Sequence, residues 1–249
     1  MNFVPGLVSI SFRQLTVEDI LSRMKDCGLQ AVEWGSDIHV PAGNLKEAAR
    51  VRELSRNAGI ATPEYGAYYT LAWPCEEKPA DTVASARALG TPIVRLWASE
   101  KNRASMTAEE YRAAVEDAER ICGENPDLTF CLECHNWSIT EDYPSALAYL
   151  KDVNLPNLKM FWQPNQFRTH QYNLEALEAL LPYVCSTHVF SWEGTDHLPL
   201  AHHTDRWQEY LSLLNGAPTD TMYLMLEFMH DDNPNSLPET AKTLLDWIH

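Results

Sequence analysis

The chain has 249 residues, of which 45% are hydrophobic and 22% are charged, and its formal net charge is −16. This length and composition suit a single domain that spans residues 1–249. The 19 basic residues are outnumbered by 35 acidic ones and form no basic run. We therefore expect no nucleic-acid partner, because phosphate backbones are bound by clustered Lys and Arg.

The sequence also predicts the cellular setting. No apolar run approaches the roughly 18 residues that a membrane helix needs, and MNFVPGLVSISF at the start lacks the basic region of a secretion signal. Six scattered cysteines form no disulfide framework, so reduced thiols in a cytoplasm are the default expectation. We expect a cytoplasmic protein with no membrane partner, and homo-oligomerisation stays open.

Short apolar runs alternate with longer amphipathic ones from end to end. The short runs predict strands at 7–12, 30–34, 60–66, 92–97, 128–134, 157–163, 184–190 and 222–228. The amphipathic runs predict helices at 17–28, 45–59, 80–90, 107–123, 144–150, 174–181, 205–214 and 236–248. Thr107 with Glu110 is typical of a capping box, and Gly28, Gly59 and Gly90 are typical helix ends.

Eight strands, each followed by a helix, predict an α/β fold with a parallel sheet. Eight such units in about 250 residues match the size of a (β/α)₈ TIM barrel. The competing architecture is an open doubly wound sheet, which usually has a Gly-rich first turn. The segment S-F-R-Q-L-T after the first predicted strand has no glycine, which favours the barrel.

Chemistry in such barrels collects at the carboxyl ends of the strands. Glu133, Gln163, His188 and Glu227 each interrupt an apolar strand near its end, on four consecutive strands. Neighbouring strands would bring these side chains together. Two carboxylates, an imidazole and an amide oxygen suit one hard or borderline divalent cation, whereas two carboxylates without a cation would repel each other.

The pair Cys131 and Cys134 lies in the same strand-five segment, in C-L-E-C. Residues three apart on a strand point to opposite faces. We therefore predict two buried thiols and not a metal or redox pair.

At these residues the chain resembles the xylose isomerase-like TIM barrel superfamily of sugar isomerases and epimerases, which is related to abasic-site endonucleases. The resemblance lies in L-E-C-H-N-W-S-I-T-E-D on strand five, S-T-H-V-F-S-W on strand seven, L-E-F-M on the last strand and A-V-E-W-G on strand two. It implies one divalent metal, Mn²⁺, Mg²⁺, Co²⁺ or Zn²⁺, held by strands five to eight. Most relatives have Asp on strand six, where this chain has Gln163, a weaker ligand.

The resemblance implies aldose–ketose isomerisation or ketose epimerisation. A metal would stabilise an enediolate, and Glu133 and Glu227 are the candidate catalytic acid and base. The candidate metal ligands are Glu133, Gln163, His188 and Glu227. The candidate substrate-binding residues are His39, Arg95, Trp97, His135, Asn136 and Trp192.

No Lys or Arg cluster marks a phosphate site at the strand ends, so the expected partner is a neutral sugar, cyclitol or other polyol. Two alternatives remain at this point. A non-catalytic or degenerate sugar-binding barrel would explain Gln163. An endonuclease-type hydrolase would need a basic face and several metals, which the net charge of −16 opposes.

Overall fold

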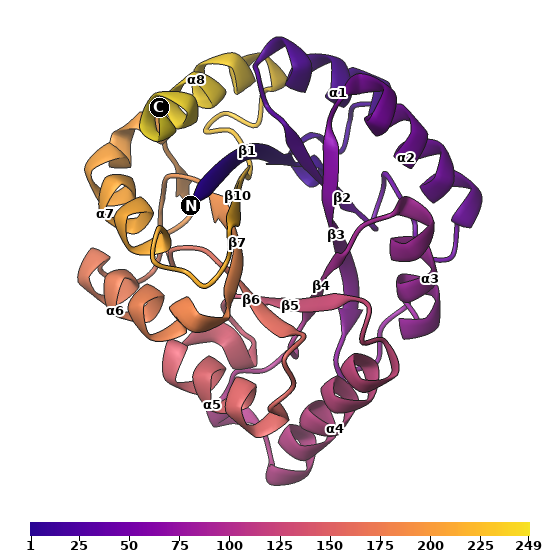
Figure 1. Cartoon of the computed structure of the whole chain (residues 1–249). Helices are drawn as coiled ribbons and strands as arrows, with labels where there is room; N and C mark the ends of the chain where they lie inside the picture. Colours follow the sequence, from indigo (N-terminus) through magenta and orange to yellow (C-terminus); the bar gives the residue numbers. More distant parts are fainter.

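The alternating apolar and amphipathic segments fold into a closed barrel of parallel strands inside a ring of helices, as predicted. The computed structural model covers residues 1–249, and Figure 1 looks down the barrel onto this ring. The barrel strands are β1 (Asn2–Val8), β2 (Ala31–Gly35), β3 (Ala61–Thr70), β4 (Ile93–Trp97), β5 (Thr129–Glu133), β6 (Leu158–Trp162), β7 (Val184–Val189) and β10 (Thr221–Leu226).

Each strand is followed by a helix on the outside of the barrel. These helices are α1 (Val17–Asp26), α2 (Leu45–Ala58), α3 (Pro79–Leu89), α4 (Ala108–Glu124), α5 (Tyr143–Val153), α6 (His170–Leu180), α7 (Thr204–Leu214) and α8 (Leu237–Ile248). The predicted capping box of Thr107 and Glu110 is present at the start of α4. Gly59 and Gly90 end α2 and α3 with φ angles of 74° and 80°, a left-handed conformation that glycine adopts without steric cost.

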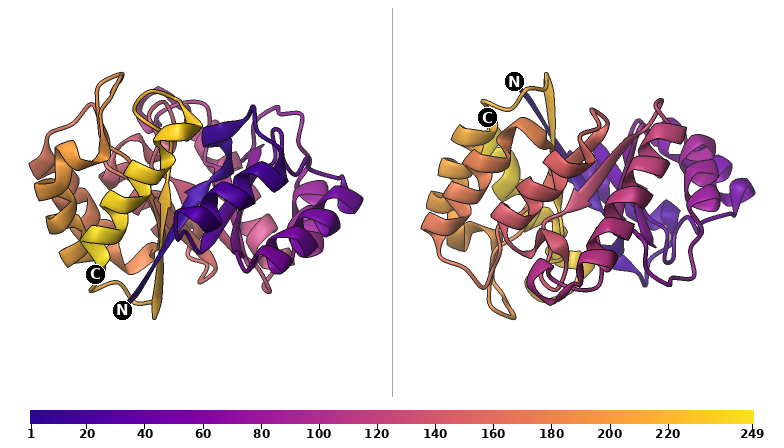
Figure 2. Two further views of the ribbon diagram at one scale, coloured as in Figure 1. Left: turned by 90° about the horizontal axis from the view of Figure 1, so that it is seen from above. Right: turned by 90° about the horizontal axis from the view of Figure 1, so that it is seen from below.

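The strands pair in the order β1, β10, β7, β6, β5, β4, β3, β2, and β2 closes back onto β1. All these pairs are parallel, so the carboxyl ends of the strands surround one mouth. The two termini lie together at the other end of the barrel (Figure 2). Strands β5, β6, β7 and β10, which carry the four predicted ligands, are successive neighbours.

The first strand was predicted at 7–12, and this was wrong. The strand is Asn2–Val8, and Ser9–Phe12 forms a short 3₁₀ helix, η1. Pro5 and Gly6 are typical of a turn, but here they lie inside β1. Gly6 is needed because a Cβ there would lie 2.2 Å from Met225 Sδ and 2.6 Å from the carbonyl oxygen of Ala31.

A second difference is a small antiparallel hairpin in the β7–α7 connection, which the sequence pattern does not predict. Its strands are β8 (Trp192–Glu193) and β9 (Asp196–His197). Strands of two residues are too short to produce a recognisable alternation.

None of the helices combines the length and hydropathy that a membrane span requires.

Candidate active site

The strand ends bring Glu133, Gln163, His188 and Glu227 together at the mouth of the barrel. Glu133 is the last residue of β5, Gln163 and Glu227 directly follow β6 and β10, and His188 lies near the end of β7. All four side chains are buried. In each strand the preceding residues are apolar and pack in the barrel, and the polar side chain lies at the end of the strand, where the barrel opens.

Gln163 and His188 connect the group by hydrogen bonds and close contacts. Gln163 Nε2 donates to Glu133 Oε1 at 3.0 Å and to the backbone carbonyl of Cys134 at 2.9 Å. His188 Nδ1 lies 3.0 Å from Gln163 Oε1, 3.5 Å from Glu227 Oε2 and 3.9 Å from Glu133 Oε1. One imidazole nitrogen therefore faces the amide oxygen and both carboxylates.

The other nitrogen of His188 reaches across the barrel interior to β2. His188 Nε2 lies 2.9 Å from Glu33 Oε2, and both side chains are fully buried. A carboxylate on the second nitrogen is one of the common partners that orient a metal-binding histidine. Glu33 was not among the predicted site residues, although its place in A-V-E-W-G, inside an apolar strand, was a visible signal.

Arg95 on β4 brings a permanent positive charge to the same network. Its Nη1 lies 3.3 Å from Glu133 Oε2, and its Nε lies 3.7 Å from Glu33 Oε1. The guanidinium also lies 5.1 Å from the ring centre of Tyr68 and 5.3 Å from that of Trp97. Nε and Nη1 have no hydrogen-bond partner within the protein, and neither has Trp97 Nε1. Such unfilled donors are expected beside a site for a polar ligand.

These contacts determine the charge state of the site. Burial alone lowers the pKa of His188, but the carboxylates of Glu227 and Glu33 outweigh it and raise this pKa well above its ordinary value. For Glu227 burial raises the pKa, and the neighbouring His188 and Arg95 bring it below its ordinary value. The site thus holds an ionised Glu227 at neutral pH.

Glu64 on β3 is a further buried carboxyl group close to this network. Neither of its oxygens has a hydrogen-bond partner. Burial, followed by the charge of Glu33, raises the pKa of Glu64 to about 8. Glu64 is therefore mostly protonated at neutral pH and adds little charge to the site.

Gly66 on β3 makes room for Glu33. A Cβ at this position would lie 2.2 Å from Glu33 Oε1 and 3.1 Å from Arg95 Nη2. Real Cβ contacts are not that short, so the carboxylate of Glu33 occupies the space that a side chain at position 66 would fill. Any larger residue there would displace the group that orients His188.

The donor set suits a divalent cation. Carboxylate oxygens of Glu133 and Glu227 and a nitrogen of His188 all lie within 4.8 Å of one another, and Glu33 provides the orienting contact. Gln163 Oε1 faces the same nitrogen of His188 and could add a fourth donor. Mixed nitrogen and oxygen ligands are typical of Zn²⁺, Co²⁺ and Mn²⁺ sites.

A cavity of about 90 Å³ opens beside Glu133, Gln163 and Glu227. Three predicted substrate-binding residues, His135, Asn136 and Trp192, also line this cavity. Trp137 lines it too; this residue is 67% exposed and has a φ of 63°, which is rare for a bulky residue and occurs most often at functional sites.

The remaining predicted substrate-binding residues do not line the cavity. Arg95 lies beneath it against Glu133, and Trp97 packs edge-on against His135 with ring centres 4.4 Å apart. His39 is buried, and its two ring nitrogens lie 3.1 Å from Ser9 Oγ and 3.3 Å from the carbonyl oxygen of Leu15. These contacts leave His39 no free nitrogen for a ligand.

The cysteines form no disulfide. Cys131 is fully buried, and Cys134, just beyond the end of β5, is half-buried. The Sγ of Cys131 lies 2.9 Å from that of Cys185 on β7. Neither thiol lies among the candidate metal ligands.

Comparison with known proteins gives structural matches over the whole chain to xylose isomerase-like TIM barrel proteins. No protein-family model matches the chain, and no curated protein is significantly similar to it in sequence. A probable 3-DHS dehydratase, AsbF of Bacillus anthracis, superposes with a TM-score of 0.79 at 20% identity, covering 98% of this chain and 99% of that one.

Two further structures show the range of proteins that share this barrel. The IolI protein with a bound zinc atom has a TM-score of 0.71 at 15% identity, covering 100% of this chain and 98% of that one. D-psicose 3-epimerase of Clostridium cellulolyticum H10, solved with D-tagatose, has a TM-score of 0.69 at 12% identity, covering 98% of both chains. At such identities these matches establish the fold alone.

Proposed function

We propose that the protein is a metal-dependent isomerase or epimerase of a small sugar or cyclitol. The observation that carries this proposal is the placement of two buried carboxylates, Glu133 and Glu227, on one small cavity with His188 between them. The epimerase solved with D-tagatose and the zinc-containing IolI protein share the barrel and support the class.

A divalent cation held by Glu133, His188 and Glu227 would stabilise negative charge that develops on the substrate carbonyl oxygen. Gln163 Oε1 would complete the ligand set. Glu33 would orient His188 through its contact with Nε2, and the missing side chain at Gly66 leaves the space that the Glu33 carboxylate occupies.

The two carboxylates would move the proton. In an isomerisation or epimerisation, one base removes a proton from the carbon next to a carbonyl and an acid returns it. The lowered pKa of Glu227 keeps this group ionised and able to accept a proton. Arg95, 3.3 Å from Glu133, would stabilise the charge on the other carboxylate.

The walls of the cavity would bind the substrate. His135 and Asn136 would hydrogen-bond to hydroxyl groups, and Trp192 would pack against a carbon face. No cluster of Lys or Arg lines this cavity, which favours a substrate without phosphate. A cavity of about 90 Å³ admits only a small part of a substrate. This favours a small molecule and disfavours a DNA strand as substrate.

Deuterium exchange tests this proposal directly. Candidate sugars and cyclitols are incubated with the enzyme and Mn²⁺ in deuterated water, and incorporation next to the carbonyl is followed by NMR. Glu133→Gln and Glu227→Gln should each slow exchange roughly 10²- to 10⁴-fold, as expected for loss of a positioned acid or base. Glu178→Gln, which neutralises an exposed carboxylate on α6, is the matched control.

The products distinguish the alternatives. Dehydration, which the likeness to AsbF brings into consideration, would also begin by removing a proton next to a carbonyl, but the product would lose one water. Binding of a sugar without any exchange would favour the non-catalytic barrel. Exchange that both glutamine variants retain at the parent rate would refute the assigned roles.

A further inference from the structure

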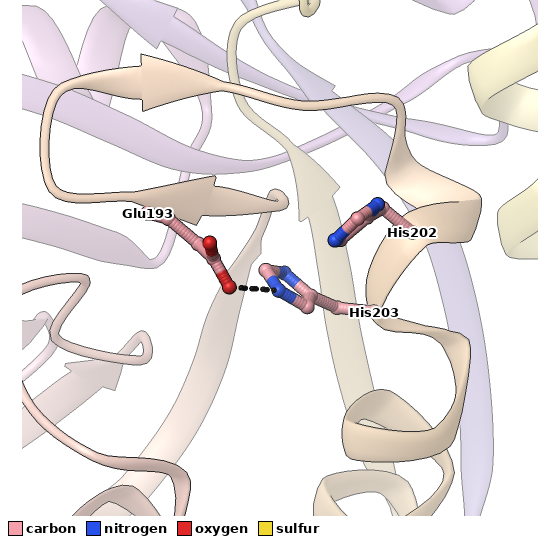
Figure 3. Close-up of side chains that lie close together, drawn as sticks. All are labelled: Glu193, His202 and His203. Atoms are coloured by element: carbon pink, nitrogen blue, oxygen red, sulfur yellow. Dashed lines mark hydrogen bonds and ion pairs between the residues drawn. The ribbon is translucent and has the colours of Figure 1, made fainter.

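A second group of metal-binding side chains lies outside the candidate active site, around the hairpin of β8 and β9. Glu193 is on β8, and His202 and His203 end the 3₁₀ helix η5 (Leu200–His203) just before α7. One ligand atom from each lies within 4.8 Å of the other two. Figure 3 shows the carboxylate pointing toward His203, with the ring of His202 beside it.

His203 is held in the manner of a metal ligand. The residue is 7% exposed, and its Nδ1 lies 2.7 Å from Ser191 Oγ. Its Nε2 points at Glu193 Oε1, 3.1 Å away. A partner on one ring nitrogen fixes the ring so that the other nitrogen can bind a cation.

The two exposed members can adjust their positions. Ligands of a zinc ion bind at about 2.0–2.2 Å, so two ligand atoms of a tetrahedral zinc ion lie roughly 3.3–3.6 Å apart. The three ligand atoms here lie within 4.8 Å of one another, so side-chain shifts of about 1 Å bring them to the distances of a zinc site. Glu193 and His202 are exposed side chains, which can rotate without disturbing the packing of the core.

One positive charge competes for the carboxylate. Arg206 Nη2 lies 3.3 Å from Glu193 Oε1, but both side chains are largely exposed, at 41% and 54%. An exposed ion pair of this kind contributes little, and no hydrogen bond engages Glu193 Oε2. A cation can thus bind Glu193 while Arg206 turns toward solvent.

We propose that Glu193, His202 and His203 form a second divalent-cation site, selective for Zn²⁺ over Mg²⁺, that fastens the β8–β9 hairpin to the start of α7. Two imidazoles and one carboxylate are a zinc-type donor set, whereas Mg²⁺ prefers oxygen ligands. Three protein ligands leave the fourth position of a tetrahedral zinc ion for water.

The site connects to the candidate active site through Trp192. This residue precedes Glu193 and stacks on His197 of the same hairpin, with ring centres 4.2 Å apart. Trp192 lines the cavity beside Glu133 and Glu227, and also a neighbouring cavity of about 380 Å³ that Glu193, His203 and Arg206 line. A zinc ion on Glu193 would therefore fix one wall of the candidate substrate cavity.

Zinc binding to tag-free protein tests the site. Glu133→Gln/Glu227→Gln removes both carboxylates of the first site, and this variant should still bind one Zn²⁺ in titration calorimetry, with Mg²⁺ in large excess unable to compete. His202→Ala in the same background should weaken binding by at least the roughly 10- to 100-fold that loss of an outer contact costs. His202 is exposed, so folding should not depend on it.

His170→Ala is the matched control, because His170 Nε2 also lies 3.1 Å from a carboxylate, Glu209 Oε1, but belongs to no such three-residue group. This variant should bind zinc as the parent does. If the double variant folds poorly, the parent is compared with the single variant His202→Ala. The variant should then bind one equivalent of zinc fewer than the parent. Equal zinc content with and without His202 would overturn the site.

Hydrogen exchange tests the fastening. Amides of residues 192–197 should exchange more slowly when Zn²⁺ is added to the double variant, and His202→Ala should abolish this effect. Zinc binding without slower exchange in the hairpin would overturn the proposed link to the cavity wall.

Discussion

Glu64 should make the stability of the protein fall as the pH rises. Its side chain is fully buried, and neither oxygen has a hydrogen-bond partner. Burial, followed by the charge of Glu33, raises the pKa of Glu64 from 4.5 to about 8 in the folded state. Between these two pH values the folded protein holds one proton that the unfolded chain has released.

The size of the effect follows from the shift. Because the folded state binds the extra proton, the free energy of unfolding falls by about 1.4 kcal/mol per pH unit across this window. The stabilising contribution is complete below pH 4.5 and is lost as the pH rises through about 8. Over the whole window the loss is on the order of 5 kcal/mol.

Glu64→Gln removes this titration while keeping the shape of the protonated side chain. Urea unfolding is followed by tryptophan fluorescence in EDTA at pH 5 to 8.5. We expect the free energy of unfolding of the variant to increase steadily, relative to that of the parent, as the pH rises. The buried amide adds a constant cost of about 1–3 kcal/mol if its donors lack partners, so the slope of the difference is the decisive quantity.

The control for this experiment is Glu178→Gln on the exposed face of α6. The difference in the free energy of unfolding between this variant and the parent should stay nearly constant with pH, since the other titrating groups are common to both proteins. A difference between Glu64→Gln and the parent that is equally constant from pH 5 to 8.5 would refute the buried, protonated Glu64.

Two further outcomes are expected. Gln163→Asp should tighten Mn²⁺ binding roughly tenfold or more, because hard cations bind more tightly when a carboxylate is added. Titration calorimetry measures this affinity. An unchanged affinity would mean that position 163 is not a ligand or that the shorter side chain cannot reach the cation. The thiols of Cys122 and Cys131 should resist a disulfide reagent at pH 8 until urea is added. Burial raises the pKa of Cys122 to about 12 and that of Cys131 well above its usual value. Mass spectrometry of the labelled native protein would identify either thiol if it reacts, and such a reaction would contradict the burial.

The barrel was predictable because its strands and helices are locally encoded. Seven of the eight predicted strands overlap the observed ones within a few residues, since each is a short apolar run between two amphipathic segments. The exception, β1, contains Pro5 and Gly6, which local rules assign to a turn. Gly6 is explained only by the approach of Met225 and Ala31, which are distant in sequence.

The candidate site was partly predictable for the same reason. Glu133, Gln163, His188 and Glu227 lie on neighbouring strands, so the order of strands along the chain is enough to bring them together. The contact between Glu33 and His188 joins β2 to β7 through the barrel interior. Strand order does not determine which side chains meet there, because that depends on side-chain length and on the empty position at Gly66.

The missing side chain at Gly66 has a consequence for engineering this protein. Position 66 lies within side-chain reach of the site, so a library that aims to reshape it would naturally include this residue. Every substitution would compete with the carboxylate of Glu33 for the same volume, and most variants would be lost for reasons unrelated to substrate choice. Trp137, exposed at the cavity rim, contacts no such buried group, so replacements that tolerate its φ of 63° disturb the site less.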